Sequence, residues 1–180
     1  MLMNAENSSL LVVDVQDRLL THIHGWQTVL ENAMWLVRVA QRIGIPVMAT
    51  EQYPKGLGQT QSDLRQLLPP ASIAEKLHFS CVSAQCLPKL AGFERRQIVV
   101  CGIEAHVCVL QTVLELCEQG KEVFVVADAI GSRDPANKTL AIERMRAHGA
   151  EIVAREMVAF EWLHEAGTPL FREVSKEFLR

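Results

Sequence analysis

Short apolar runs alternate with segments of helical pattern along most of the chain. Six runs have the length and composition of buried parallel strands, and they cover residues 10–13, 45–50, 72–77, 97–101, 122–127 and 151–154. Helices are predicted between them, over residues 27–42, 62–68, 83–90, 105–119, 135–147 and 169–178. Gly44 ends the first of these helices, and Asp134 followed by Pro135 begins the fifth.

This alternation of strands and helices predicts an α/β fold. Continuous apolar strands are typical of parallel sheets that are covered on both faces. We therefore expect a three-layer, Rossmann-like and mostly parallel six-stranded sheet with helices on both faces. No internal repeat or linker interrupts residues 1–180, so the sequence predicts a single domain.

The composition of the chain argues against nucleic acids and membranes as partners. The chain is 49% hydrophobic and 22% charged, and its formal net charge of −3 gives no basic footprint for a nucleic acid. No apolar run approaches the roughly 18 residues that span a membrane. Residues 1–9 are polar and lack a secretory pattern, so a cytoplasmic protein is expected. The apolar, partly amphipathic helices favour a homo-oligomer.

The five cysteines are expected to be reduced thiols. Their number is odd and no secretory signal precedes them, which argues against a disulfide framework. Cys101 and Cys117 fall within apolar strand and helix patterns, which indicates packing. Cys81 and Cys86 lack the second pair of ligands that a structural zinc needs, and the sequence assigns them no role.

Reactive residue types follow several of the predicted strands, at the sheet edge where parallel α/β folds bind ligands. Gly102 joins a strand to a helix, and Cys108 lies one turn into that helix. The positive end of the helix and Lys76 would favour a thiolate at Cys108, with a lowered pKa. Asp14 would act as the general base, and N–H groups of the turn would hold an oxyanion. The combination predicts acyl transfer to water.

Each of these residues also has a simpler interpretation. A cysteine in a helix is often a packing residue, an aspartate after a strand often caps a helix, and a lysine there is often a surface charge. Gln16 and Gln52 would orient the substrate or Asp14. In the simpler interpretation they cap helices or contact solvent. Phe79 would line the pocket or belong to the core. A redox-sensing role for the Cys108 thiol is a further interpretation, but the sequence places no second cysteine clearly beside it.

Three segments together resemble the motif blocks of the isochorismatase-like cysteine hydrolases: LLVVDVQDRL, EKLHFS and VVCGIEAHVCV. They occur in the family's order, and the helix and strand pattern agrees from residue 9 to 154. The resemblance implies a catalytic triad of Cys108, Asp14 and Lys76. It also implies an oxyanion hole that includes the Cys108 N–H group, shaped by a cis peptide bond between Ile103 and Glu104.

Differences between this sequence and better-known members of that family argue against two of the family's reactions. Nicotinamidases carry an Asp-x-His-x-x-His metal site after the second strand, whereas residues 51–58 here contain no histidine. We therefore expect neither a metal nor another cofactor. Isochorismatases lack the nucleophilic cysteine, so Cys108 argues against isochorismate. TEQYPKGLG and GIEAHVCV look closest to short isochorismatase-domain proteins of unassigned substrate.

The leading hypothesis is a hydrolase of C–N amide-type bonds in small molecules, acting through a thioester on Cys108. The alternative is a non-catalytic interaction or scaffold protein that keeps the family's pocket.

Overall fold

A six-stranded, all-parallel sheet forms the centre of the computed structural model, which describes residues 1–179. The strand order is β3-β2-β1-β4-β5-β6. The strands are β1 (Ser8–Val13), β2 (Val47–Gln52), β3 (Ile73–Lys76), β4 (Gln97–Ile103), β5 (Glu122–Gly131) and β6 (Glu151–Val153). The predicted fold class is confirmed.

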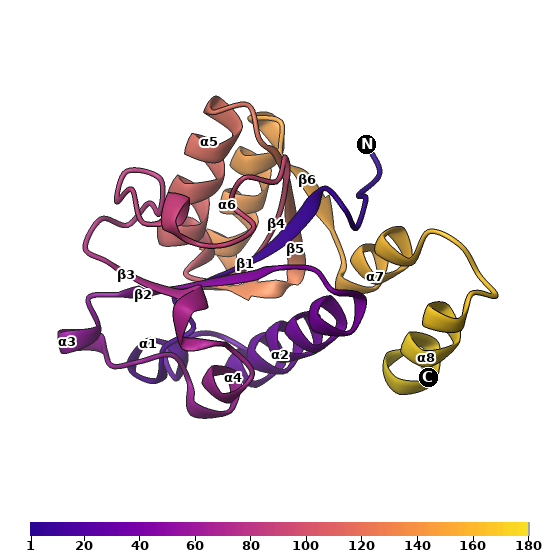
Figure 1. Cartoon of the computed structure of the whole chain (residues 1–180). Coiled ribbons are helices and arrows are strands. Elements are labelled where there is room, and N and C mark those ends of the chain that lie inside the picture. Colours follow the sequence, from indigo (N-terminus) through magenta and orange to yellow (C-terminus); the bar gives the residue numbers. More distant parts are fainter. Residues whose placement is uncertain (180) are drawn as a thin grey trace.

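In the described part of the chain, eight α-helices connect and extend these strands: α1 (Asp17–Leu20), α2 (Trp26–Ile43), α3 (Pro54–Leu57), α4 (Ser62–Gln66), α5 (Leu110–Glu118), α6 (Pro135–Ala147), α7 (Arg155–Leu163) and α8 (Pro169–Phe178). Two 3₁₀ turns (Pro70–Ser72 and Leu87–Lys89) and a π-helical turn (Ala105–Val109) complete the described elements. Figure 1 shows α3 at one end of the molecule and α7 and α8 at the other. No helix within residues 1–179 has both the length and the apolar character needed to cross a membrane.

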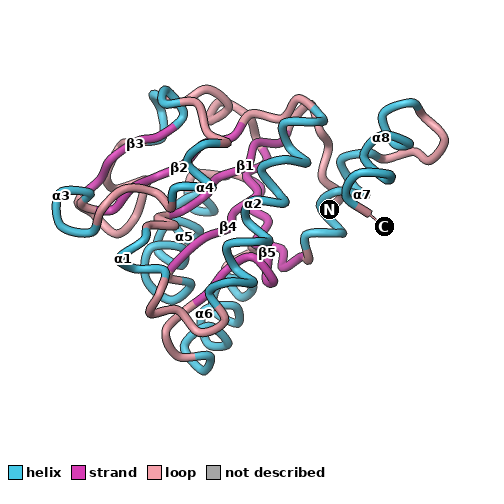
Figure 2. The backbone as a smooth tube through the Cα atoms, turned by 90° about the horizontal axis from the view of Figure 1, so that it is seen from below, coloured by secondary structure: helices cyan, strands magenta, loops and turns pink. Residues whose placement is uncertain are grey.

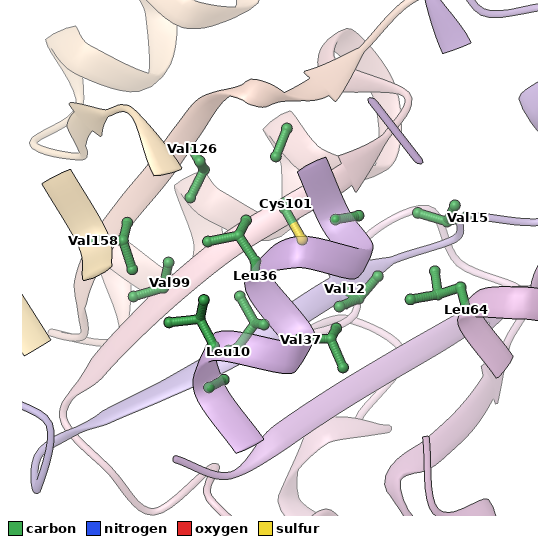
Figure 3. Packing of buried hydrophobic residues seen from close by; sticks show 14 of the residues in the cluster. Leu10, Val12, Val15, Leu36, Val37, Leu64, Val99, Cys101, Val126 and Val158 are labelled. Atoms are coloured by element: carbon green, nitrogen blue, oxygen red, sulfur yellow. The ribbon is translucent and has the colours of Figure 1, made fainter. Parts of the chain in front are cut away.

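The sheet separates two hydrophobic cores. In β1, Leu10 faces the core covered by α2 and α7, and Leu11 faces the core covered by α5 and α6. Figure 2 shows α2 lying across the strands, with α5 and α6 on the far side. In Figure 3, Leu36 and Val37 of α2 point at the strands of the first core. Burial on both faces explains why the strands read as continuous apolar runs.

Three local expectations from the sequence were wrong. Residues 83–90 form turns and a short 3₁₀ segment instead of a helix, because Gln85 has a φ of +52° and the Ser83 hydroxyl and N–H groups bond to Glu115. Residues 51–59 are rich in proline and glycine, which predicts a loop, but they contain the one-turn helix α3. Helix α7 was not predicted, and it is held by the contact of the Arg155 N–H group with Asp128 Oδ1 at 2.9 Å.

Gly102 lets β4 approach β1 closely just before the turn that carries Cys108. Its φ is +118°, and a Cβ atom at this position would lie 2.1 Å from the Val13 carbonyl oxygen. Val13 and Gly102 are paired in the sheet, at the carboxyl ends of the two strands. A side chain at residue 102 would therefore force apart the strand ends that carry Asp14 and Cys108.

Candidate active site

Asp14 follows β1 directly and is fully buried. Its φ of +51° is unusual for a residue with a side chain. The carboxylate is held on both oxygens, because Oδ1 accepts from the Thr50 hydroxyl and Oδ2 accepts from Lys76 Nζ, each at 2.7 Å. The backbone N–H of Asp14 donates to the Thr50 carbonyl at 3.1 Å. Asp14 is thus a fixed, buried carboxylate and not a helix cap on the surface.

Lys76 ends β3, and its side chain is buried as an ion pair with Asp14. Its ammonium group also donates to Gln52 Oε1 at 2.7 Å and to the Phe79 carbonyl at 2.9 Å. Burial by itself would lower the pKa of Lys76, but the Asp14 carboxylate raises it, and the net shift is upward. Lys76 is therefore a buried cation, and its interpretation as a solvated surface charge is wrong.

Cys108 lies in the π-helical turn between β4 and α5 and is 6% exposed. Burial, followed by the charge of Asp14, raises the pKa of its thiol to about 12, although Lys76 acts in the opposite direction. The sequence predicted a lowered pKa, and this expectation was wrong in sign. The thiol is therefore protonated near neutral pH and must lose its proton when it reacts.

The turn before Cys108 is fixed at several points. The peptide bond between Ile103 and Glu104 is cis, at the position that the family resemblance implies. The Glu104 carbonyl accepts from the N–H groups of Val107 (3.0 Å) and Val109 (3.2 Å). The Glu104 carboxylate pairs with Arg133 Nε at 3.0 Å, so this side chain points toward the loop before α6.

Gln16 and Gln52 form a buried support beneath Lys76. Gln16 Oε1 accepts from the Gln52 N–H at 2.7 Å, and Gln16 Nε2 donates to the carbonyls of Gln52 (3.0 Å) and Gly58 (2.6 Å). Gln52 Nε2 donates to the Leu77 carbonyl at 2.7 Å. Both side-chain amides are thus used within the protein, and Gln52 orients Lys76. Their interpretation as solvent-facing residues is wrong.

Phe79 belongs to the surface of this region. Its side chain is 52% exposed, so its interpretation as a core residue is wrong. A cavity of about 490 Å³ opens nearby along the edge strand β3, lined by Tyr53, Pro54, Lys55, Glu75, Lys76, Leu77, His78 and Ala84. The cavity has apolar and charged walls, but the fully buried side chain of Lys76 is not exposed in it.

Two neighbouring residues of β2 make buried contacts in or beside the site, although no specific role was predicted for them. Thr50 is paired with Val13 across the sheet, and its hydroxyl reaches Asp14. Glu51 is buried and accepts from the Thr60 N–H (2.7 Å) and hydroxyl (2.8 Å), and it pairs with Arg65. The position of both residues at the end of a predicted strand was the sequence feature that could have indicated their role. Within residues 1–179, no group of three His, Cys, Asp or Glu side chains is placed to hold a metal ion.

Known proteins share the sequence pattern and the fold of this chain. Residues 8–157 match the model of the isochorismatase domain. Isochorismatase family protein 1B of Dictyostelium discoideum is 34% identical over 174 residues, which cover 94% of this chain and 84% of the relative. The secreted isochorismatase effector Isc1 of Phytophthora sojae is 36% identical, with 94% and 83% covered. Isochorismatase domain-containing protein 2 of Pongo abelii is 36% identical, with 94% and 82% covered.

Solved structures share the fold over nearly the whole chain. A structure described as the MAR1 ribonuclease of Caenorhabditis elegans has a TM-score of 0.89 and 34% identity, covering 100% of this chain and 93% of its own. YcaC of Pseudomonas aeruginosa, solved with hexane-2,5-diol and covalent acrylamide, has a TM-score of 0.89 and 24% identity, with 99% and 92% covered. On the family model and these relatives, the chain belongs to the isochorismatase family.

Proposed function

We propose that this protein hydrolyses a C–N amide-type bond in a small molecule through a thioester on Cys108, without a metal or other cofactor. The buried ion pair of Asp14 and Lys76 beside the Cys108 thiol is the observation that carries the proposal. A carboxylate and an ammonium group removed from water are expensive to bury, so their place next to a cysteine favours a catalytic use. The family membership supports a hydrolase in general.

The proposed reaction begins with a proton transfer. Asp14 takes the thiol proton as Cys108 Sγ attacks the carbonyl carbon, and the resulting oxyanion accepts a hydrogen bond from the Cys108 N–H in the turn after Ile103 and Glu104. The tetrahedral intermediate collapses, the C–N bond breaks, and Asp14 returns its proton to the leaving amine. Asp14 then takes a proton from a water molecule as the water oxygen attacks the thioester carbonyl. The C–S bond breaks, and Asp14 returns this proton to the Cys108 sulfur, which releases a carboxylic acid and restores the thiol. Lys76 holds the Asp14 carboxylate in place through their ion pair.

An activated acyl ester or a small aldehyde tests this assignment through covalent trapping. We expect mass spectrometry of the tryptic peptide 97–121 to find one adduct, on Cys108, in the native protein and none on this peptide in the Cys108→Ala variant. Cys117→Ala is the matched control, because Cys117 lies on the same helical segment and is partly exposed. An adduct on peptide 97–121 that persists in Cys108→Ala would refute the assignment. A screen of small amides, compared with Cys108→Ala, then identifies the substrate.

RNA is a second candidate substrate, because the Caenorhabditis elegans neighbour at 34% identity is described as a ribonuclease. The net charge of −3 gives this chain little general attraction for a polyanion. RNA cleavage that is lost in Cys108→Ala would favour this candidate over a small amide. If neither RNA nor any amide is hydrolysed above the Cys108→Ala control, a scaffold role is favoured.

We also propose that the protein is a homo-oligomer. Three large apolar side chains are exposed near the cavity of β3: Tyr53 at 49%, Leu77 at 71% and Phe79 at 52%. A second copy of the chain over this edge would bury them. Sedimentation equilibrium gives the oligomeric state directly, and Leu77→Asp should shift it toward the monomer.

A further inference from the structure

A second pair of thiols lies close to the site but has no place in the proposed reaction. Cys81 and Cys86 are in the turn between β3 and the 3₁₀ segment Leu87–Lys89. The N–H group and the thiol of Cys86 both donate to the Cys81 carbonyl, each at 3.4 Å. The pKa of each thiol is also shifted by the other, so the two side chains are neighbours. The turn therefore brings the Cys86 thiol against the residue that carries the second thiol.

The two thiols differ in access. Cys81 is fully buried, whereas Cys86 is 7% exposed and lines a cavity of about 380 Å³ together with Glu75, Gln85 and Lys89. The neighbouring Cys81 side chain lowers the pKa of Cys86, and the Cys86 side chain raises the pKa of Cys81. The thiol that meets solvent is thus the one with more thiolate character, which is the arrangement of a reactive cysteine with a second thiol behind it.

Cys81 is anchored by contacts that lead to the active site. Its N–H donates to the Thr112 hydroxyl at 3.0 Å, and its thiol donates to the Thr50 hydroxyl at 3.7 Å. Thr50 in turn donates to Asp14. The inner thiol therefore cannot move away from Cys86 without disturbing β2 and α5, and it stays available to react with its neighbour.

The other cysteines lack this combination of features. Burial raises the pKa of Cys101 to about 12, and burial also raises that of Cys117. The pKa of Cys108 is raised to about 12 as well. All five cysteines lie in the described part of the chain, and among them Cys86 alone has a lowered pKa.

We propose that Cys86 and Cys81 form a peroxide-sensitive dithiol, a redox site that is independent of the proposed hydrolysis at Cys108. The Cys86 thiolate attacks a peroxide oxygen, the O–O bond breaks, and Cys86 becomes a sulfenic acid while the leaving hydroxide takes up a proton. The Cys81 sulfur then attacks the sulfenic sulfur, the S–O bond breaks, and the departing hydroxide takes the Cys81 proton as water. The dithiol loses two electrons to give a disulfide, and the peroxide is reduced to water.

Tryptic peptides separate this pair from the remaining cysteines. Cleavage after Lys76 and Lys89 releases residues 77–89 with both Cys81 and Cys86, whereas residues 97–121 carry the other three cysteines. The full-length Cys108→Ala protein is treated with hydrogen peroxide, alkylated and digested. We expect the 77–89 peptide to lose two hydrogens and to carry no alkyl group. Dithiothreitol should restore double alkylation.

Single substitutions in the same background assign the two roles. Cys81→Ser should leave a sulfenic acid on Cys86 that dimedone traps, and Cys86→Ser should abolish both the disulfide and the dimedone adduct. Cys86 should react roughly tenfold or more faster than Cys117 in the same sample, because of its greater thiolate fraction. If the 77–89 peptide stays fully alkylated while Cys117 is oxidised, the proposal fails. In the native protein, a peptide 77–89 cross-linked to 97–121 would also overturn it.

Discussion

Cys108 faces an ion pair and not a lone cation. The positive charge of Lys76 favours its thiolate, but the negative charge of Asp14 lies close by and opposes it, and burial then decides the outcome. A thiol in this environment is not held as a thiolate before the reaction begins. Asp14 can remove the proton during the attack, when the negative charge is already passing from sulfur to the carbonyl oxygen.

The raised pKa of Cys108 predicts a high-pH labelling profile. Because the protonated thiol persists above the ordinary value of 9, direct alkylation of Cys108 by iodoacetamide should keep accelerating with pH from 8 to about 10.5, a range in which the fold is retained. Mass spectrometry of peptide 97–121 measures the rate in a Cys101→Ala/Cys117→Ala background. A rate that levels off near neutral pH would show a stabilised thiolate and contradict this mechanism.

Thr50 should position Asp14 through its hydroxyl. Thr50→Val keeps the shape of the side chain but removes the donor to Asp14 Oδ1, whereas Thr50→Ser keeps the donor. A hydrogen bond to a charged group contributes about 1.5–3 kcal/mol, so Thr50→Val should slow acylation of Cys108 by roughly tenfold or more. Acylation by an activated ester is the measurement. Equal rates in Val and Ser variants would exclude a role for the hydroxyl.

At the scale of elements, the contact of β1 with β4 depends on Gly102. Gly102→Ala would place a methyl group 2.1 Å from the Val13 carbonyl oxygen, so we expect a loss of more than about 4 kcal/mol in the free energy of unfolding. Gly120→Ala is the control, because Gly120 has a φ of +79° but no atom within 4 Å of the added methyl group. It should lose only about 1 kcal/mol. Urea denaturation of the two variants compares them, and similar losses would disprove the close-contact argument.

How far the sequence predicted each element depended on where its stabilising contacts lie. The strands were predictable because both faces of a parallel sheet are apolar, which the runs in β1 and β4 display directly. The 83–90 segment was not, because its turns depend on the distant Glu115. Helix α7 was missed because its first residue is anchored by Asp128, far away in the chain.

The candidate site was likewise predictable only where the strand topology determines it. Topology brings the ends of parallel strands to one edge, and this was enough to predict that Asp14 and Lys76 would meet there. The pKa of Cys108 was predicted with the wrong sign, because it depends on burial and on the charge of Asp14, which no spacing reveals. The link from Thr50 to Asp14 depends on a side-chain orientation, so the sequence indicated only the position of Thr50.

At the scale of the whole molecule, the sheet encloses thiols in both of its cores. Cys101 lies in the core beneath α2, and Cys108 lies in the core beneath α5. The pKa of each is raised to about 12 from an ordinary value of 9, mainly by burial. The folded chain therefore keeps protons that the unfolded chain releases in alkaline solution.

This difference predicts a loss of stability as the pH rises. Below pH 9 both thiols are protonated in the folded and the unfolded chain, and their contribution to stability is fully present. Between pH 9 and about 12 the unfolded chain ionises first, so the free energy of unfolding falls by about 1.4 kcal/mol per pH unit for each thiol. Cys101→Ala should remove one of these slopes. Val99→Ala, in the same strand and core, should lower stability at every pH and leave the slope unchanged. Urea denaturation of the three proteins from pH 8 to about pH 10.5 tests both statements, and identical slopes for Cys101→Ala and the native protein would mean that Cys101 does not titrate differently on folding.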